Sequence, residues 1–436
     1  MNLEKAGEEI YKLIEQLFPI SRSLSGNGVR ETLRRIQEII PLQIHEVPTG
    51  TKAFDWTVPK EWNITDAYVM DEKGSKVIDF KKHNLHVVGY SVPVDMTVSL
   101  AELQNHLYSL EAQPDAIPYI TSYYQERWGF CITDRERRAL KDGSYRVVID
   151  SELTDGSLTY GELVLPGKSK KEIFISTYTC HPSMANDNLS GPAVATYLAQ
   201  WVMSAPRKYT YRFVFIPETI GALTYLSKHL GHLKEQVIAG FNLTCMGDER
   251  AYSFMPSRNE TSLADTVALE VLADLHPDFV RYSFLKRGSD ERQYCSPGVD
   301  LPVVSIMRSK YGTYPEYHTS LDDLTLVTPV GLGGSVTVLK TCIERLESSR
   351  IYRAVCYGEP QLGKRGLYPM LSHENTLGLS EEENAKGLSL RRLLDILAYA
   401  DGIRDVPGIA RTLGISPYEL QPSLDTLHAA GLLEEY

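Results

Sequence analysis

Residues 172–203 read EIFISTYTCHPSMANDNLSGPAVATYLAQWVM, and this stretch decides the fold. The apolar run over 172–179 predicts a buried strand, and 189–203 predicts the helix that follows it. The same alternation continues down the chain and predicts an α/β fold, with a doubly wound, mostly parallel sheet and helices on both faces. Further strands are predicted at 211–216, 237–246 and 303–307, and further helices at 220–230 and 330–346.

The residue composition and the pattern of predicted elements change on either side of this α/β region. Residues 47–155 are aromatic and β-branched with frequent turns, which predicts an inserted, mainly β domain with one helix at 99–110. Beyond an acidic run at 381–383 that is typical of a linker, short helices predict a winged helix-turn-helix. These helices are predicted at 388–399, 406–413 and 417–428. The predicted domains are a catalytic α/β domain at 1–46 and 156–370, the inserted domain at 47–155, and the winged helix-turn-helix domain at 381–436.

Composition limits the class of protein. The 436 residues have an apolar fraction of 43%, a charged fraction of 23% and a formal net charge of −11. This length predicts more than one domain, and the acidic charge argues against general binding to nucleic acid or anionic membranes. The 6 cysteines lack the regular spacing of a disulfide framework. Without a signal-peptide core or an apolar run that could span a bilayer, we expect a reduced, cytoplasmic protein with no membrane span.

Side chains that could bind a metal stand at the ends of predicted strands. His181, Glu218 and His318 each follow a strand, and Asp187 lies just before a helix. Ligands of such sheets gather outside the carboxyl ends of the strands, so we expect these four groups to converge on one crevice. Two histidines and one carboxylate, with a second carboxylate as base, are the set that catalytic zinc uses in hydrolases. Taken singly, each has a plainer interpretation: a core or loop histidine, a helix N-cap, or a loop carboxylate.

These segments resemble the ordered motifs of a known family. Residues 187–191 (DNLSG), 217–221 (PETIG), 289–291 (SDE) and 317–322 (YHTSLD) are similar to motifs of zinc-dependent aminopeptidases of the bacterial leucyl aminopeptidase and glutaminyl cyclase clan. The whole chain, with 54–59 (FDWTVP) and its helix-turn-helix, resembles a branch described as aminopeptidase-like and often found with bacterial polysaccharide-biosynthesis genes. The resemblance implies a zinc exopeptidase-like catalytic domain.

The resemblance also implies roles for individual residues. His181, Asp187 and His318 match metal ligands of the family. Glu218 matches the general base, which takes a proton from the attacking water and returns it to the leaving amine.

Two positions depart from the two-zinc members of the family. Those members carry acidic ligands where this chain has Thr219 and Thr244, and threonine is a poor ligand for zinc. We therefore expect one zinc ion. A different alignment would allow Asp248 or Glu291 to restore a second site.

Other side chains are candidates for supporting roles. Asp322 is expected either to hold an imidazole in place or to cap a helix after His318. Cys180 is expected to be a small buried residue rather than a thiolate ligand. Arginines would bind a substrate carboxylate and acids a free amine, and the sequence does not choose between them. The alternative to substrate binding is that each of these side chains is simply exposed to solvent. The candidates near the crevice are Arg287, Asp290, Glu291, Arg292 and Arg308.

The most direct interpretation is a single-zinc hydrolase of amide bonds, an aminopeptidase-type exopeptidase that acts on small peptides. The alternatives are a carboxypeptidase, an amide cyclase or deacylase acting on an amino-sugar or glycan-linked substrate, and a non-catalytic metal-binding regulator or scaffold. Residues 417–428 contain no Lys or Arg, so DNA binding is not expected. The winged helix is expected to serve packing, dimerisation or partner docking, and the inserted domain to gate the crevice or to form a homo-oligomer.

Overall fold

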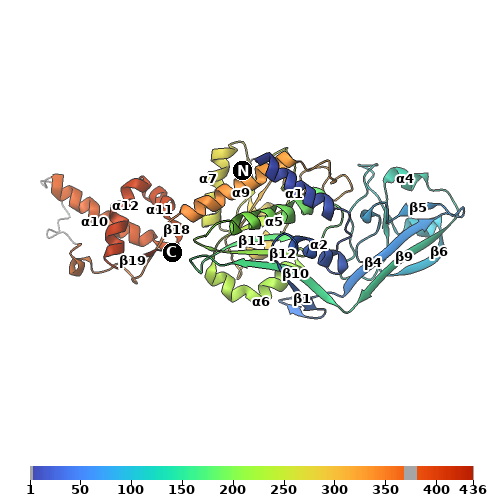
Figure 1. Cartoon of the computed structure of the whole chain (residues 1–436), viewed down its shortest axis with the longest axis horizontal. Coiled ribbons are helices and arrows are strands. Elements are labelled where there is room, and N and C mark those ends of the chain that lie inside the picture. Colours follow the sequence, from blue (N-terminus) through green and yellow to red (C-terminus); the bar gives the residue numbers. More distant parts are fainter. Residues whose placement is uncertain (1–2, 368–380, 436) are drawn as a thin grey trace.

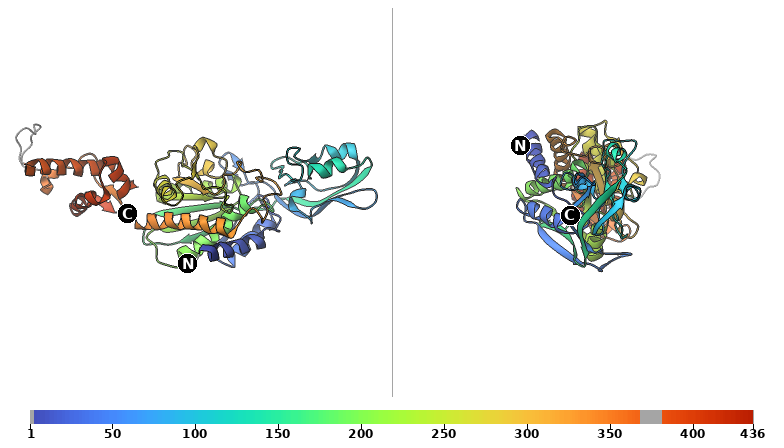
Figure 2. Two further views of the ribbon diagram at one scale, coloured as in Figure 1. Left: turned by 90° about the horizontal axis from the view of Figure 1, so that it is seen from above. Right: turned by 90° about the vertical axis from the view of Figure 1, so that its right-hand side faces the viewer.

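The computed structural model describes residues 3–367 and 381–435 (Figure 1). Three regions lie in a row along the long axis of the molecule. An α/β region is in the middle, the inserted β region lies at one end, and the C-terminal helices lie at the other. Figure 2 shows the same row from above and from one end.

One large sheet forms the middle region. Its strands are β1 (Gln43–Pro48), β10 (Ser157–Leu165), β11 (Glu172–Tyr178), β12 (Thr210–Ile216), β13 (Val237–Leu243), β14 (Ser253–Met255), β15 (Val280–Arg281) and β16 (Val303–Met307). The 8-stranded sheet has the order β1-β10-β12-β11-β13-β16-β14-β15. The strands at its centre, β12, β11, β13 and β16, run parallel to one another, whereas β1, β10 and β14 have antiparallel neighbours. The predicted mostly parallel α/β sheet is confirmed.

Helices cover both faces of this sheet because its central strands are apolar on both faces. In β11, Ile173 and Ile175 belong to one core cluster and Phe174 to another, which is why the strand reads as a continuous apolar run. The first cluster includes α1 (Leu3–Leu17), α2 (Asn27–Gln37), α5 (Ser190–Met203), α7 (Leu263–Leu275) and α9 (Pro329–Ser348). The second includes α6 (Ile220–Gln236) and α8 (Glu291–Tyr294). Within the described ranges, no helix is long and apolar enough to cross a membrane.

The inserted region is built on an antiparallel sheet of 4 strands with the order β5-β4-β9-β6. Its strands are β4 (Glu61–Met70), β5 (Lys76–Asp79), β6 (Val94–Ser99) and β9 (Ser144–Thr154), and a short hairpin of β2 (Lys52–Ala53) and β3 (Trp56–Thr57) precedes them. Val69 and Val147 of this sheet belong to the same core cluster as Phe174. The insertion therefore shares a core with the α/β region.

The helix predicted at 99–110 is shorter than expected. It spans α3 (Leu100–Gln104), and the chain then forms β7 (Leu107–Tyr108), which pairs with β8 (Phe130–Cys131). The pairing partner lies far along the chain, so no local pattern marks the end of the helix.

The C-terminal region combines three helices with a small sheet, as in a winged helix. Its elements are α10 (Glu381–Tyr399), α11 (Val406–Leu413), α12 (Pro417–Ala429), β17 (Ile351–Ala354), β18 (Asp401–Asp405) and β19 (Leu433–Glu435). The acidic run 381–383 begins α10 rather than forming the predicted linker. Strand β17 lies within the range 156–370 that is predicted for the catalytic domain, but it pairs with β18 and β19. The domain limits stay predictions.

Arg30 of α2 ties the middle region to the inserted sheet. Its guanidinium contacts Glu61, the first residue of β4, at 2.6 and 2.7 Å, and Glu46 of β1 at 2.9 Å. The hydrogen bonds from Arg30 lower the pKa of Glu61 to about 2. A charged, two-point contact of this kind is among the stronger hydrogen bonds in proteins.

We expect Glu61→Gln to lower the free energy of unfolding by about 1–3 kcal/mol at neutral pH, because it removes this charged contact. The folded-state pKa of Glu61 lies below its ordinary value of 4.5, so the contribution is present above that pH and is lost as the pH falls towards 2. Urea unfolding of both proteins at several pH values measures the difference. The matched control is Glu31→Gln, which alters an exposed pair with Arg35 on the same helix. A difference between wild type and Glu61→Gln that does not change with pH would contradict the account.

Candidate metal centre

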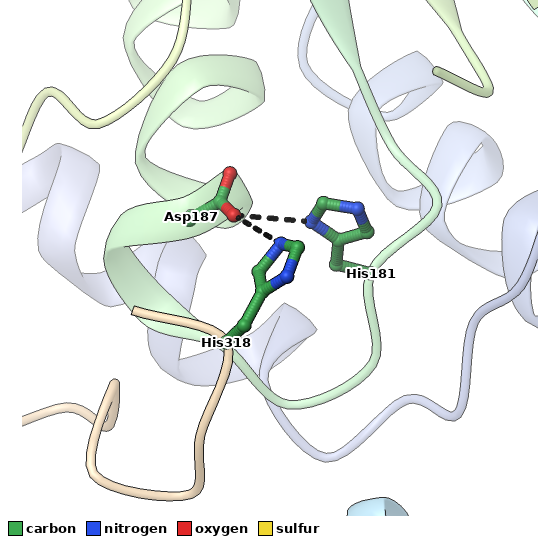
Figure 3. Close-up of side chains that lie close together, drawn as sticks. All are labelled: His181, Asp187 and His318. Atoms are coloured by element: carbon green, nitrogen blue, oxygen red, sulfur yellow. Dashed lines mark ion pairs between the residues drawn. The ribbon is translucent and has the colours of Figure 1, made fainter. Parts of the chain in front are cut away.

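Three of the predicted ligands lie together at the carboxyl ends of the central strands (Figure 3). His181 follows β11, Asp187 lies in the turn before α5, and His318 lies in the loop after β16. Asp187 Oδ2 is 3.5 Å from His181 Nδ1 and 3.0 Å from His318 Nε2. The three ligand atoms lie within 4.8 Å of one another, and the described part of the chain holds no other such group of His, Cys, Asp or Glu.

Three polar atoms of these side chains face one another at ion-pair distances but make no hydrogen bond. His181 Nδ1, Asp187 Oδ2 and His318 Nε2 are buried and make no hydrogen bond. A buried polar atom without a partner costs about 1–3 kcal/mol, yet here three of them face a common centre (Figure 3). One cation would satisfy all three, and two imidazole nitrogens with one carboxylate oxygen suit zinc. The residues therefore fit a metal ion.

The other oxygen of Asp187 is held by hydroxyl groups. Asp187 Oδ1 accepts hydrogen bonds from the hydroxyl of Tyr178 and from Thr244 Oγ1, the latter at 3.4 Å. Thr244 Oγ1 also lies 2.6 Å from the Tyr178 hydroxyl, so its single proton is directed to only one of these two oxygens. Burial alone would raise the pKa of Asp187, but the imidazoles of His181 and His318 hold it below its usual range. The carboxylate is therefore anionic, with Oδ2 turned towards the histidines.

Asp322 holds the backbone around Asp187. Its carboxylate accepts hydrogen bonds from the N–H groups of Asn186 at 2.6 Å and Asp187 at 2.8 Å. This turn is irregular, since Asp187 has φ −108° and ψ 86° within the short helical segment η2 (Ala185–Leu189). Both predicted roles of Asp322 are therefore wrong: its oxygens bind backbone N–H groups rather than an imidazole, and no helix follows His318 before α9.

Glu218 faces the centre from the end of β12. Its Oε2 lies 3.5 Å from His181 Nε2, and its side chain is 21% exposed. Its N–H donates to Cys180 Sγ at 3.3 Å, and Thr219 turns the chain with φ 63°. Burial raises the pKa of the Cys180 thiol, and Cys180 is not part of the group of ligand atoms. Glu218 has the position of a general base, beside the ligands and open to a cavity of about 300 Å³.

Asp290 places a second carboxyl group near Glu218. Its Oδ1 accepts the N–H of Thr219 at 2.8 Å, while its Oδ2 is buried without a hydrogen bond. Burial, and then the charge of Glu218, raise the pKa of Asp290 well above its usual range. A buried carboxyl group with a raised pKa therefore lies near the candidate base.

Comparison with known proteins supplies the family. A family model described as a domain of unknown function (DUF4910) matches residues 11–349. The chain belongs to the DUF4910 family. A winged helix-turn-helix model matches residues 350–435, a range that includes β17.

Two relatives from Clostridium acetobutylicum resemble this DUF4910 protein along its whole length. One, provisionally named a polysaccharide biosynthesis protein with an aminopeptidase-like domain, is 45% identical over 436 residues, covering 99% of this chain and 98% of its own. The other is a crystal structure provisionally named a peptidase, with 44% identity, a TM-score of 0.81, and coverage of 100% of this chain and 98% of its own. The predicted resemblance to an aminopeptidase-like branch associated with polysaccharide biosynthesis is confirmed.

More distant structures share the fold. The zinc aminopeptidase BSAP from Bacillus subtilis has a TM-score of 0.56 at 14% identity, covering 78% of this chain and 94% of its own. A similarity at this level of identity concerns the fold alone. The α/β region of this DUF4910 protein therefore has an aminopeptidase-like fold, as predicted.

Two acidic residues offered for a second metal have other partners. Glu291 accepts hydrogen bonds from the hydroxyl of Tyr311 and the amide of Asn242. Asp248 accepts them from the N–H and hydroxyl of Ser309 at 2.9 and 2.8 Å. Neither belongs to the group of ligand atoms, so the alternative alignment has no structural support in this DUF4910 protein.

The predicted arginines lie in different places. Arg292 lines the cavity beside Glu218. Arg308 is buried against the ring of Tyr252, at 3.7 Å from the ring centroid. Arg287 is exposed and lies over Phe284. Of these three arginines, Arg292 alone reaches the cavity.

The inserted region contributes a residue that sequence reasoning missed. The ring of Tyr119 lies 5.1 Å from the rings of both His181 and His318. Its N–H donates to the carbonyl of His318 at 2.8 Å, and Pro118 forms a β-bridge with Thr319. These contacts join segments far apart in the chain, so no local pattern could reveal them.

Arg22 is a second residue that was missed. Its Nε donates to the carbonyl of His181 at 2.9 Å and its Nη1 to the carbonyl of Leu17 at 2.6 Å. Burial lowers the pKa of Arg22 to about 9. The side chain ties the end of α1 to the loop that carries His181.

We expect Asp322→Asn to weaken zinc binding by about 10- to 100-fold, which is the usual effect of losing a residue that orients a metal ligand. The single amide oxygen of asparagine cannot accept hydrogen bonds from both N–H groups in the way that the two carboxylate oxygens do. Competition with a chromogenic chelator measures the affinity. Asp323→Asn is the matched control, since the Asp323 carboxylate bonds Thr325. Equal zinc affinity of wild type and Asp322→Asn would contradict the assigned role.

Proposed function

We propose that this protein is a metal-dependent hydrolase of amide bonds in small peptides or peptide-like substrates. The observation that carries the proposal is the set of three buried atoms without hydrogen bonds, on His181, Asp187 and His318, next to the open carboxylate of Glu218. The aminopeptidase-like fold supports it, because the set lies at the strand ends where such folds bind ligands.

The donor set favours one zinc ion. Asp187 Oδ1 is engaged by Tyr178, so this carboxylate has only Oδ2 to offer. Thr244, at a position where two-zinc relatives carry an acid, bonds Tyr178 and Asp187. A second cation would lack an anionic ligand there.

The metal ligands and the residues around them have different roles in the proposed reaction. A zinc ion held by His181, Asp187 and His318 would supply a Lewis acid for the carbonyl and lower the pKa of a water molecule. Glu218 accepts a proton on Oε2 and delivers it to the departing nitrogen. The raised pKa of Asp290 favours its protonated form next to Glu218, and Tyr119 covers both imidazoles.

We expect the purified protein, loaded with zinc and desalted, to hold one zinc ion per chain. His318→Ala should lower zinc affinity by more than the roughly 100-fold limit typical of residues that only orient a ligand. Inductively coupled plasma mass spectrometry measures the zinc content of the wild type and of each variant after desalting. His106→Ala is the control, since His106 stacks on Trp128 in the inserted region. Two tightly bound ions in the wild type would contradict the single-zinc proposal, and none would contradict the metal centre.

We expect Glu218→Gln to keep zinc and to lose about 10²- to 10⁴-fold in kcat on any amide substrate that the wild type cleaves, because a general base contributes this much. A panel of dipeptides and N-acyl amino acids identifies that substrate. Glu235→Gln, at an exposed carboxylate at the end of α6, is the control. Full turnover by Glu218→Gln would exclude Glu218 as the base. Absence of turnover by the zinc-loaded wild type across the panel would favour a metal-binding scaffold.

A further inference from the structure

The cavity next to Glu218 has apolar walls that come from separate parts of the chain. Trp56 and Tyr124 of the inserted region meet edge to face, with ring centroids 5.6 Å apart, and are 40% and 52% exposed. The cavity of about 300 Å³ is large enough for one amino-acid side chain. The apolar and aromatic lining residues are Leu24, Trp56, Tyr123, Tyr124 and Ile220.

Two side chains of opposite charge face this cavity. Among the described lining residues, Glu218 and Arg292 are the charged groups outside the metal ligands. Glu218 is already assigned to proton transfer. Arg292 therefore supplies the charge with which a substrate group would interact.

Arg292 is oriented by Thr219 and keeps hydrogen-bonding capacity. Its Nη2 donates to Thr219 Oγ1 at 2.7 Å, and its Nε is buried without a hydrogen bond, so Nη1, which is not among the buried atoms without a partner, is the nitrogen left for a ligand. Among the described residues no carboxylate lies within ion-pair distance of this guanidinium, although the buried carboxyl group of Asp290 is close enough to interact with its charge. A guanidinium with free N–H groups in a partly buried site favours a planar anion such as a carboxylate.

Thr219 explains why this charge is available. A carboxylate at position 219 would lie within reach of the Arg292 guanidinium, which now donates to the Thr219 hydroxyl. Such an acid would neutralise the guanidinium. Threonine instead accepts one hydrogen bond and adds no charge, so the positive charge remains directed at the cavity.

We propose that this cavity binds the carboxylate end of the substrate, with the carboxylate on Arg292 and an apolar side chain against Trp56 and Tyr124. The substrate class is an N-acyl amino acid or a peptide whose last residue is aromatic or aliphatic. The assignment rests on the proposed hydrolase function. The hydrolysed C–N bond takes OH on the acyl carbon and H on the nitrogen of the released residue. A free ammonium group is disfavoured in the same place because Arg292 would repel it.

Three ligands with one carbon skeleton test the proposal by binding. They are 3-phenylpropionate, 3-phenylpropionamide and 3-phenylpropylamine, measured by isothermal titration calorimetry on the zinc-loaded full chain. The expected result is that the carboxylate binds about ten- to a hundred-fold more tightly than the amide, the range of a hydrogen bond to a charged group. The amine should also bind more weakly than the carboxylate, because it cannot accept a hydrogen bond from Arg292.

Substitutions assign the preference to one side chain. Arg292→Gln should remove the preference for the carboxylate over the amide. Arg287→Gln, at an exposed arginine nearby in the sequence, should keep it. A contact between carboxylate and zinc would survive in Arg292→Gln, so the loss identifies Arg292. Equal binding of acid and amide by wild type, failure of the acid to bind, or an unchanged preference in Arg292→Gln would overturn the proposal.

Hydrolysis separates this inference from the hydrolase proposal. N-acetyl-Gly-Phe should be cleaved with at least about ten-fold higher kcat/KM than its C-terminal amide, and Arg292→Gln should abolish the ratio. Equal cleavage of both compounds would overturn the inference and leave the hydrolase intact. A carboxylate preference in binding without cleavage of either compound would overturn the hydrolase and leave the assignment of Arg292 intact.

Discussion

The buried carboxylate of Asp187 is the constraint on which the rest of the site depends. An anion with 0% exposure is costly unless every oxygen has a partner. Tyr178 and Thr244 satisfy Oδ1, and Asp322 holds the backbone N–H. Oδ2 faces two imidazole nitrogens that themselves lack hydrogen bonds. One cation between them, as proposed, would satisfy all three atoms at once.

The inserted region belongs to this site rather than lying beside it. It shares a core cluster with one face of the central sheet, and its Pro118 bridges to Thr319 next to a metal ligand. Tyr119 covers the imidazoles, and Trp56 and Tyr124 wall the cavity. A bare α/β sheet would place the ligands but leave them open to water. The insertion therefore forms part of the cavity wall.

The predictable features are those with a local signal. The apolar run of β11 and the polar residues after it located His181 and Asp187, because the parallel sheet brings the ends of distant strands together. The missed features arise from contacts between distant segments. Tyr119 reaches the site through one bridge, and Arg22 through a bond to a carbonyl. A short strand such as β17 has too few residues to show a hydrophobic periodicity. The role of a side chain that binds a distant backbone group, such as Asp322, leaves no pattern in the sequence around it.

The most direct test of the metal centre is anomalous diffraction at the zinc absorption edge, from crystals of the full chain grown with zinc. The account predicts one anomalous peak, bonded to His181 Nδ1, Asp187 Oδ2 and His318 Nε2, at zinc–ligand distances of about 2.0–2.2 Å. No peak between these atoms, or a second peak of similar height bound at Asp187 Oδ1, would contradict it.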